Sequence, residues 1–314
     1  MRLRADLFSA AMPLLVGSWD NGNIEVVQMI IPILRHPKSL DGIWTGGGAA
    51  VVHSVYHGTV NLQWKEGIAA LQPREVPGSP VSLTLKLDAR RFGALRLQAG
   101  MEARFAPEGL YLQEYLFPCS GSTVWDPALR PWISSPGLDS LRAEVESAII
   151  DLCACGGLAD VALGRIDGRW KDLAASRAAA ERIAAAWRCR TEGDCAAVGR
   201  ALAGLIGLGE GLTPSGDDFC AGVLAALRIR GEPEAQILRL YLEREIRLRL
   251  NGTNDVSAQF LRCAALGQFS EPVLALLGRP LGARERRAAA ADLGAVGHSS
   301  GVDTLNGIYL GLSL

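Results

Sequence analysis

Residues 207–218, GLGEGLTPSGDD, place two adjacent carboxylates, Asp217 and Asp218, directly before the apolar run FCAGVLAAL. Carboxylates so placed can hold a divalent cation such as Mg²⁺, act as a general base toward an N–H or O–H group, or cap a helix. The glycines of this stretch allow the backbone to approach a small ligand closely. The sequence therefore predicts a buried helix that starts beside a site, and it leaves these three roles open.

The same pattern occurs a second time, 85 residues downstream. LGEGLTPSGDDFCAGVLAAL, residues 208–227, aligns with LGAVGHSSGVDTLNGIYLGL, residues 293–312, through the shared pattern L-G-x(5)-S-G-x-D-x(3)-G-[VI]-x(3)-L. Both segments carry almost no charge after their acidic residues, which is typical of helices inside a core. We therefore expect a structural repeat of two buried helices, related by a local pseudo-two-fold axis, whose N-termini converge on one pocket.

Ser215 and Ser300 stand where helix N-caps are expected, with Asp218 and Asp303 three residues later. In that spacing each side chain can satisfy an otherwise unpaired backbone N–H at the start of its helix. Capping is thus one sufficient explanation for these four residues. It gives Asp217 no role, and burying a carboxylate has a desolvation cost.

Capping also leaves the glycines of the repeat unexplained. A glycine inside a helix costs about 0.5–1 kcal/mol relative to alanine, so something must require the missing side chains. We expect Gly222 and Gly307 to face each other where the helices cross. Gly216 and Gly301 are expected to leave the first helical turns open to a ligand.

Two converging helix N-termini offer N–H donors and partial positive charge, which suits an oxyanion such as phosphate or carboxylate. A helix N-terminus would favour the neutral imidazole of His298, which can relay a proton; an ordinary loop histidine is the alternative. The predicted catalytic residues are Asp217, Asp218, His298 and Asp303. The predicted substrate-binding residues are Gly209, Gly211, Thr213, Ser215, Gly216, Ser299, Ser300 and Gly301, with Mg²⁺ as a possible cofactor.

Charge and composition exclude several classes of function. The net charge of −1 gives no overall field that attracts nucleic acid or an anionic membrane. No run of 18 apolar residues occurs, so no membrane span is predicted. The seven cysteines are odd in number and lack C-x-x-C spacing, which indicates reduced thiols and a cytoplasmic protein. TGGGAAVV, residues 45–52, lacks the Lys-Ser/Thr ending of a nucleotide-binding P-loop.

The chain changes character near residue 135. Residues 41–125 contain short β segments with Gly and Pro between them, AAVVHSVYHGTVNLQW, VSLTLKL, GALRLQAG and GLYLQEYLF. We expect the β layer to be filled by Asn61 and four tryptophans, Trp44, Trp64, Trp125 and Trp132. After PWISSPGLDS the pattern predicts helices at 138–152, 176–188, 194–207, 216–230, 234–250, 256–267, 284–293 and 301–313. We therefore predict an α+β fold. Residues 1–135 form an antiparallel β-rich layer or barrel with a short N-terminal helix, and residues 136–314 form a helical domain.

GLGEGLTPSGDDFCAG and GHSSGVDTLNGIYLGL, and more faintly HSVYHGTVNLQ followed by GSPVSLTL, resemble a bacterial family that includes the AllH subunit of oxamate carbamoyltransferase. The resemblance implies a part in anaerobic allantoin breakdown, where oxalurate and phosphate give oxamate and carbamoyl phosphate, beside other kinds of subunit. The implied ligands are phosphate, carbamoyl phosphate and oxamate. Two alternatives remain open, a non-catalytic scaffold subunit and a Mg²⁺-dependent kinase or hydrolase acting on a small acid.

Overall fold

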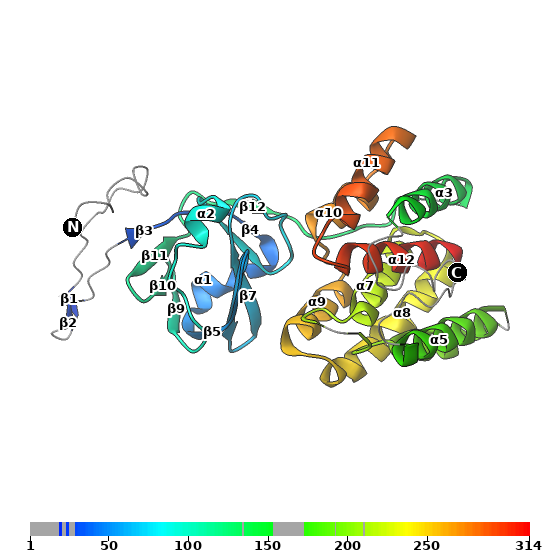
Figure 1. Ribbon diagram of the computed structural model, residues 1–314, viewed down its shortest axis with the longest axis horizontal. Coiled ribbons are helices and arrows are strands. Elements are labelled where there is room, and N and C mark those ends of the chain that lie inside the picture. The colour runs from blue at the N-terminus through cyan, green and yellow to red at the C-terminus, as the bar shows by residue number, and fades with distance from the viewer. Residues whose placement is uncertain are drawn as a thin grey trace. The chain divides into compact units, whose positions relative to one another are not determined.

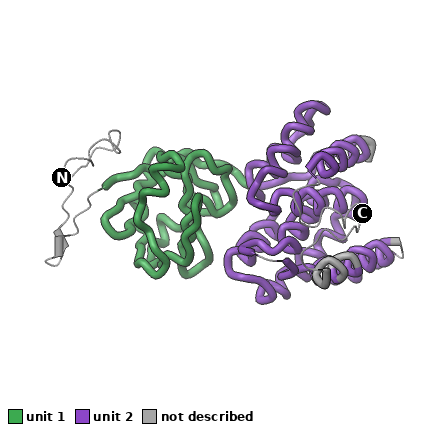
Figure 2. Tube along the Cα trace, in the orientation of Figure 1, with its two compact units in different colours: residues 1–127 green, residues 128–314 purple. Residues whose placement is uncertain are grey.

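The computed structural model describes residues 19–20, 23–24, 29–133, 135–152, 173–191, 193–209 and 211–314. The helix predicted at the N-terminus falls on residues 1–18, outside the described part. The chain divides into two compact units, residues 1–127 and 128–314 (Figure 2), and each has its own hydrophobic core. Within the described residues, no helix is long and apolar enough to cross a membrane.

The first unit is built on a sheet of ten strands in the order β12-β4-β8-β7-β6-β5-β9-β10-β11-β3 (Figure 1). Most neighbouring strands are antiparallel, and β7–β8, β4–β12 and β3–β11 are parallel. The strands are β3 (Met29–Ile30), β4 (Ile33–Pro37), β5 (Gly48–Tyr56), β6 (Thr59–Trp64), β7 (Gly67–Gln72), β8 (Ser82–Leu85), β9 (Glu102–Ala106), β10 (Gly109–Leu112), β11 (Tyr115–Pro118) and β12 (Thr123–Trp125). A separate pair joins β1 (Trp19–Asp20) to β2 (Asn23–Ile24), and two short helices are α1 (Gly42–Gly46) and α2 (Ala89–Phe92).

Alternation along these strands sends one set of side chains into the core of the first unit. It is clearest in β9, where the buried Ala103 and Phe105 alternate with the exposed Glu102 and Arg104, whereas all four residues of β8 are buried. Leu62, Leu83 and Leu110 have no exposed surface. The strand predicted from GALRLQAG was wrong. Asp88 accepts a hydrogen bond from the Arg91 amide and caps α2, which ends just before that segment, and no strand forms there.

The second unit is helical, as predicted, so the α+β class with a β-rich part followed by a helical part is confirmed. Its helices are α3 (Ser135–Asp151), α5 (Leu173–Thr191), α6 (Cys195–Ala203), α7 (Ser215–Ile229), α8 (Pro233–Arg249), α9 (Asp255–Ala265), α10 (Glu271–Leu277), α11 (Ala283–Gly294) and α12 (Ser300–Ser313). Every helix predicted within residues 136–314 is present, and among the described α-helices of this unit only the short α10 was not predicted. The predicted boundary at residue 135 stays a prediction, but Trp132 belongs to the helical core rather than the β layer, since its Nε1 donates to the Leu277 carbonyl.

Helices α7 and α12 are the buried pair that the repeat predicted, and both lie inside the second unit (Figure 1). A Cβ on Gly222 would lie 2.1 Å from the Thr304 carbonyl oxygen, and a Cβ on Gly307 would lie 2.0 Å from that of Phe219. Phe219 and Thr304 are themselves equivalent positions of the repeat. The contact is therefore reciprocal. This confirms that Gly222 and Gly307 face each other where the two helices cross.

Candidate functional site

The N-terminal ends of α7 and α12 come together, as the repeat predicted. The hydroxyls of Thr213, just before α7, and Ser300, the first residue of α12, lie 2.7 Å apart. Asp218 lies close enough to Asp303 for the two carboxyls to interact electrostatically, and Asp303 has no exposed surface. The close crossing of the helices at their glycines brings their first turns together. We name Thr213, Asp218, Ser300 and Asp303 the acid–hydroxyl cluster.

Asp218 is a strongly perturbed acid of this cluster. Burial raises the pKa of its carboxyl well above the ordinary value, and the neighbouring Asp303 carboxylate raises it further; hydrogen bonds from Ser300 and Thr213 act in the opposite direction. Its Oδ2 is buried and has no hydrogen-bond partner among the described residues. A carboxyl in this position holds a proton at a higher pH than a free aspartate does. It can therefore donate a hydrogen bond or a proton.

Asp217 points elsewhere, because successive residues of a helix are rotated by about 100°. One of its carboxylate oxygens accepts from the Gly207 amide at 2.8 Å. The other accepts from the hydroxyls of Thr253 and Ser257, the latter at 2.6 Å. These donors tie the loop before α7 to the start of α9. The geometry thus gives Asp217 a positioning role, and its predicted catalytic role stays a prediction that these contacts do not favour.

The capping role predicted for the two serines was wrong. Helix α7 begins at Ser215 itself, after Pro214, and α12 begins at Ser300, after Ser299; neither end has a side-chain cap. Proline fixes the entry of the chain into α7, which leaves the serine inside the first turn. The Ser300 hydroxyl interacts with Thr213 instead. The serine side chains therefore do not act as helix caps.

Several amides predicted to hold an anion already have backbone partners. The amide of Gly216 donates to Leu208, those of Asp217 and Asp218 to Pro214, that of Gly301 to Val296 and that of Asp303 to Ser299. The space beside the two helix-start glycines is filled as well. A Cβ on Gly216 or Gly301 would lie 1.9 Å from the carbonyl oxygen of Leu205 or Leu293, respectively. These glycines serve close packing, Gly216 against the turn after α6 and Gly301 against the end of α11, so they do not leave the first helical turns open to a ligand.

The remaining predicted residues lie around the cluster. Gly209 and Gly211 adopt left-handed backbone conformations, with φ of 113° and 95°, in the loop before α7. Gly209 packs against the buried Ser215. His298 is exposed in the turn before α12. Among the described residues, no group of three or more His, Cys, Asp or Glu side chains is arranged to hold a metal ion.

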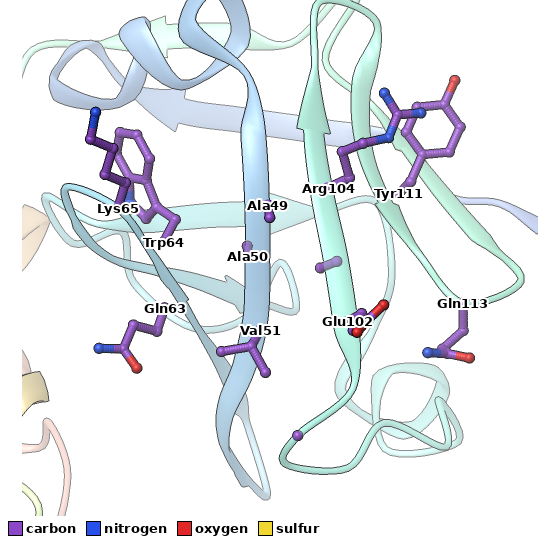
Figure 3. Close-up of a pocket in the computed structure, with 12 residues that line it drawn as sticks. Ala49, Ala50, Val51, Gln63, Trp64, Lys65, Glu102, Arg104, Tyr111 and Gln113 are labelled. Carbon is purple, nitrogen blue, oxygen red and sulfur yellow. The ribbon is translucent and has the colours of Figure 1, made fainter.

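A second feature, in the first unit, was not predicted. A hollow of about 1170 Å³ lies over β5, β6, β9 and β10. Figure 3 shows Gln63 and Lys65 on one side of β5 and Glu102 and Arg104 on the other, with the small Ala49 and Val51 between them. The register explains this, since Val51 pairs with both Gln63 and Glu102. Strand pairing across the chain decides this arrangement, so no local motif could have indicated it.

The contacts of Asp217 were missed for the same reason. Asn254 caps α9 by accepting from the Ser257 amide at 3.0 Å, and its Nδ2 donates to the Leu212 carbonyl at 2.8 Å. The sequence carries the cap as a visible signal, Asn-Asp-Val-Ser before a helix. It carries no signal that shows which carboxylate accepts hydrogen bonds from the Thr253 and Ser257 hydroxyls.

Comparison with known protein families gives two matches. A family model described as oxamate carbamoyltransferase subunit AllH matches residues 205–312, which include both copies of the repeat. A model described as the AllH family N-terminal domain matches residues 30–123, which include every lining residue of the hollow. No solved structure matches the chain.

Proposed function

The chain belongs to the AllH family of oxamate carbamoyltransferase subunits, and we propose that its acid–hydroxyl cluster binds the small substrate and manages a proton during carbamoyl transfer. The family match is the basis for assigning the chain to this enzyme and to allantoin degradation. The proposal for the site rests on one observation. Asp218 has a buried oxygen without a hydrogen-bond partner among the described residues, beside a second carboxyl and two hydroxyls that face each other across the two helices.

The reaction has a step that such a carboxyl suits. When phosphate attacks the ureido carbonyl of oxalurate, an O–C bond forms and the C–N bond to oxamate breaks. The departing nitrogen must then take up a proton. A carboxylic acid whose pKa is raised retains its proton closer to neutral pH and can deliver it to that nitrogen. In the reverse direction, the Asp218 carboxylate takes the proton from the oxamate amide as it attacks carbamoyl phosphate.

The raised pKa also removes an objection to binding an anion here. Two ionised aspartates would repel phosphate, oxamate or carbamoyl phosphate. When Asp218 is protonated, its O–H becomes a donor, and the hydroxyls of Thr213 and Ser300 are donors beside it. Together these three groups can hydrogen-bond carboxylate or phosphate oxygens. The site proposed is thus a hydroxyl and carboxyl site, in place of a cradle of helix amides.

Replacing Asp218 by Asn tests the proposal in the assembled enzyme. The amide keeps the shape but carries no transferable proton, so we expect kcat to fall about 10²–10⁴-fold, the range of general acid–base catalysis. Asp139→Asn, at an exposed position of α3, is the matched control and should leave kcat unchanged. Circular dichroism checks that both variants fold. Unchanged turnover of Asp218→Asn would refute the catalytic assignment.

The packing role of Gly216 and Gly301 favours a second candidate, a scaffold subunit whose repeat serves only the fold. On that hypothesis Asp218→Asn alters stability or assembly and leaves kcat of the assembled enzyme intact. The kinase or hydrolase alternative stays a hypothesis; among the described residues, no group of three or more His, Cys, Asp or Glu side chains is arranged to hold a metal ion.

A further inference from the structure

Helix α8 exposes an apolar stripe that the described residues leave uncovered, except at the edge where Tyr241 meets α6. Leu240 is 56 % exposed and Leu248 is 67 % exposed, values far above those of a packed leucine. Ile237 and Tyr241 are exposed on the same helix. With Arg244 these residues follow the spacing i, i+3, i+4, i+7, i+11, so they share one side of the helix over about 16 Å. We name these five residues the α8 stripe.

The opposite side of α8 accounts for the packing of this helix within its own unit. Ala235, Leu238, Leu242 and Ile246 are buried there. The backbone at Tyr241 and Leu242 approaches Gly199 of α6 so closely that a Cβ on that glycine would lie 3.1 Å away. The charges at helical spacing in residues 234–250 are typical of a solvated surface helix. Helix α8 does lie at the surface, but its outer side is apolar along the stripe.

The buried and exposed sides of α8 differ in charge. Glu243 is buried and pairs with Arg239, Arg228 and Arg247, and Glu245 is buried and pairs with Arg249. Beyond the first turn, α8 therefore exposes no carboxylate. Arg244 is exposed in the middle of the stripe and forms no ion pair with any described residue. The outer side of α8 is thus apolar with a net positive charge.

We propose that the α8 stripe docks a helix of another subunit of oxamate carbamoyltransferase, one that presents an apolar side with a carboxylate opposite Arg244. Rows of side chains at i±3 and i±4 spacing pack into the grooves of a second helix. Because a second copy of this chain would bring the same cations and no carboxylate, charge complementarity favours a different subunit. The proposal rests on the chain being a subunit of this enzyme, and it is independent of the acid–hydroxyl cluster.

The end of α8 is also close in sequence to residues that contact Asp217 and the loop before α7. Residues 250–252 follow it as a short 3₁₀ helix, and Thr253 and Asn254 then hold Asp217 and the Leu212 carbonyl. A subunit docked on the α8 stripe is therefore connected through four residues to the loop before α7.

Binding of the full-length chain to each of the other purified subunits, measured by biolayer interferometry, tests the proposal. We expect the wild-type chain to bind one of them, with Leu240→Glu and Leu248→Glu each weakening binding at least about tenfold, as at buried interface positions. Arg244→Glu should weaken it and reduce its salt dependence. Ile150→Glu, on an exposed apolar residue of α3, is the matched control and should bind as the wild type does. Circular dichroism confirms folding of each variant.

Three results would overturn the proposal: no binding of the wild-type chain to any of these subunits, unchanged affinity in all three α8 variants, or self-association of the wild-type chain that Leu240→Glu abolishes. The last result, from sedimentation velocity, would make the stripe a homodimer interface. None of these readouts requires turnover, so they are separable from a failure of the Asp218 proposal.

Discussion

Replacing Asp217 by Asn and replacing Asp218 by Asn should change the free energy of unfolding in opposite directions. Asp217 accepts three hydrogen bonds as a buried carboxylate, from Gly207, Thr253 and Ser257. A hydrogen bond to a charged group contributes about 1.5–3 kcal/mol and a neutral one about 1 kcal/mol. Weakening three such bonds, with part of the loss offset by the easier burial of an amide, predicts that Asp217→Asn lowers the free energy of unfolding by about 1–3 kcal/mol.

Asp218→Asn should instead leave stability unchanged or raise it. The folded protein raises the pKa of Asp218, through burial first and the Asp303 carboxylate second, so the folded state binds its proton more tightly than the unfolded state. The stability that this proton contributes is full below the unfolded pKa, about 3.9, and is lost as pH rises toward the folded pKa. The advantage of Asp218→Asn over wild type should therefore grow with pH through that window, by at most about 1.4 kcal/mol per pH unit.

Urea unfolding followed by far-ultraviolet circular dichroism measures both effects, because the second unit supplies nearly all of the helix. Wild type and the two variants are compared at pH 5, 6.5 and 8. The reasoning is refuted if Asp218→Asn destabilises as much as Asp217→Asn, or if its difference from wild type shows no dependence on pH.

Three further outcomes follow from the structure. Gly222→Ala should destabilise the helical unit by about 1–3 kcal/mol in urea unfolding, despite the higher helix propensity of alanine, because its Cβ would lie 2.1 Å from the Thr304 carbonyl oxygen; an unchanged midpoint would contradict the crossing. Burial raises the pKa of Cys263 to about 11, so this thiol should resist iodoacetamide at pH 8 in the native protein and react only after unfolding, as mass spectrometry of the alkylated peptides would show. His36→Leu should lower the thermal midpoint of the first unit, because it removes the bond of 2.9 Å to Asp41 from a buried ring; a midpoint equal to wild type would contradict that role.

The sequence was most informative about the second unit, where helical periodicity and the repeated pattern can each be read from short continuous segments. The pairing of Gly222 with Gly307 was predictable because a glycine inside a helix is costly unless another backbone occupies its place. The same reasoning failed at Gly216 and Gly301. There the neighbouring backbone belongs to the turn after α6 and to the end of α11, and the sequence alone does not distinguish such a neighbour from a ligand.

The candidate site was predicted in its location and only partly in its composition. Thr213, Ser300, Asp218 and Asp303 lie together because helix crossing fixes their first turns. The separation of Asp217 from them follows from helix rotation, but its partners come from the start of α9, about 40 residues further along the chain. Contacts of that kind, like the hollow over β5, depend on tertiary pairing that no local pattern encodes.

The two copies of the repeat carry different residues at the positions that surround the cluster, so the two sides of the site differ chemically. The repeat pairs Asp217, whose carboxylate accepts from the Gly207 amide of a neighbouring loop, with Val302, which is fully buried and apolar. It also pairs Thr213, whose hydroxyl meets Ser300, with the exposed His298. The two copies therefore differ at this position: the α7 copy has a hydroxyl that meets Ser300, and the α12 copy has an exposed histidine. A small substrate with chemically different ends, such as oxalurate, requires such inequality, because a symmetric pair of helices would bind it equally well in either orientation.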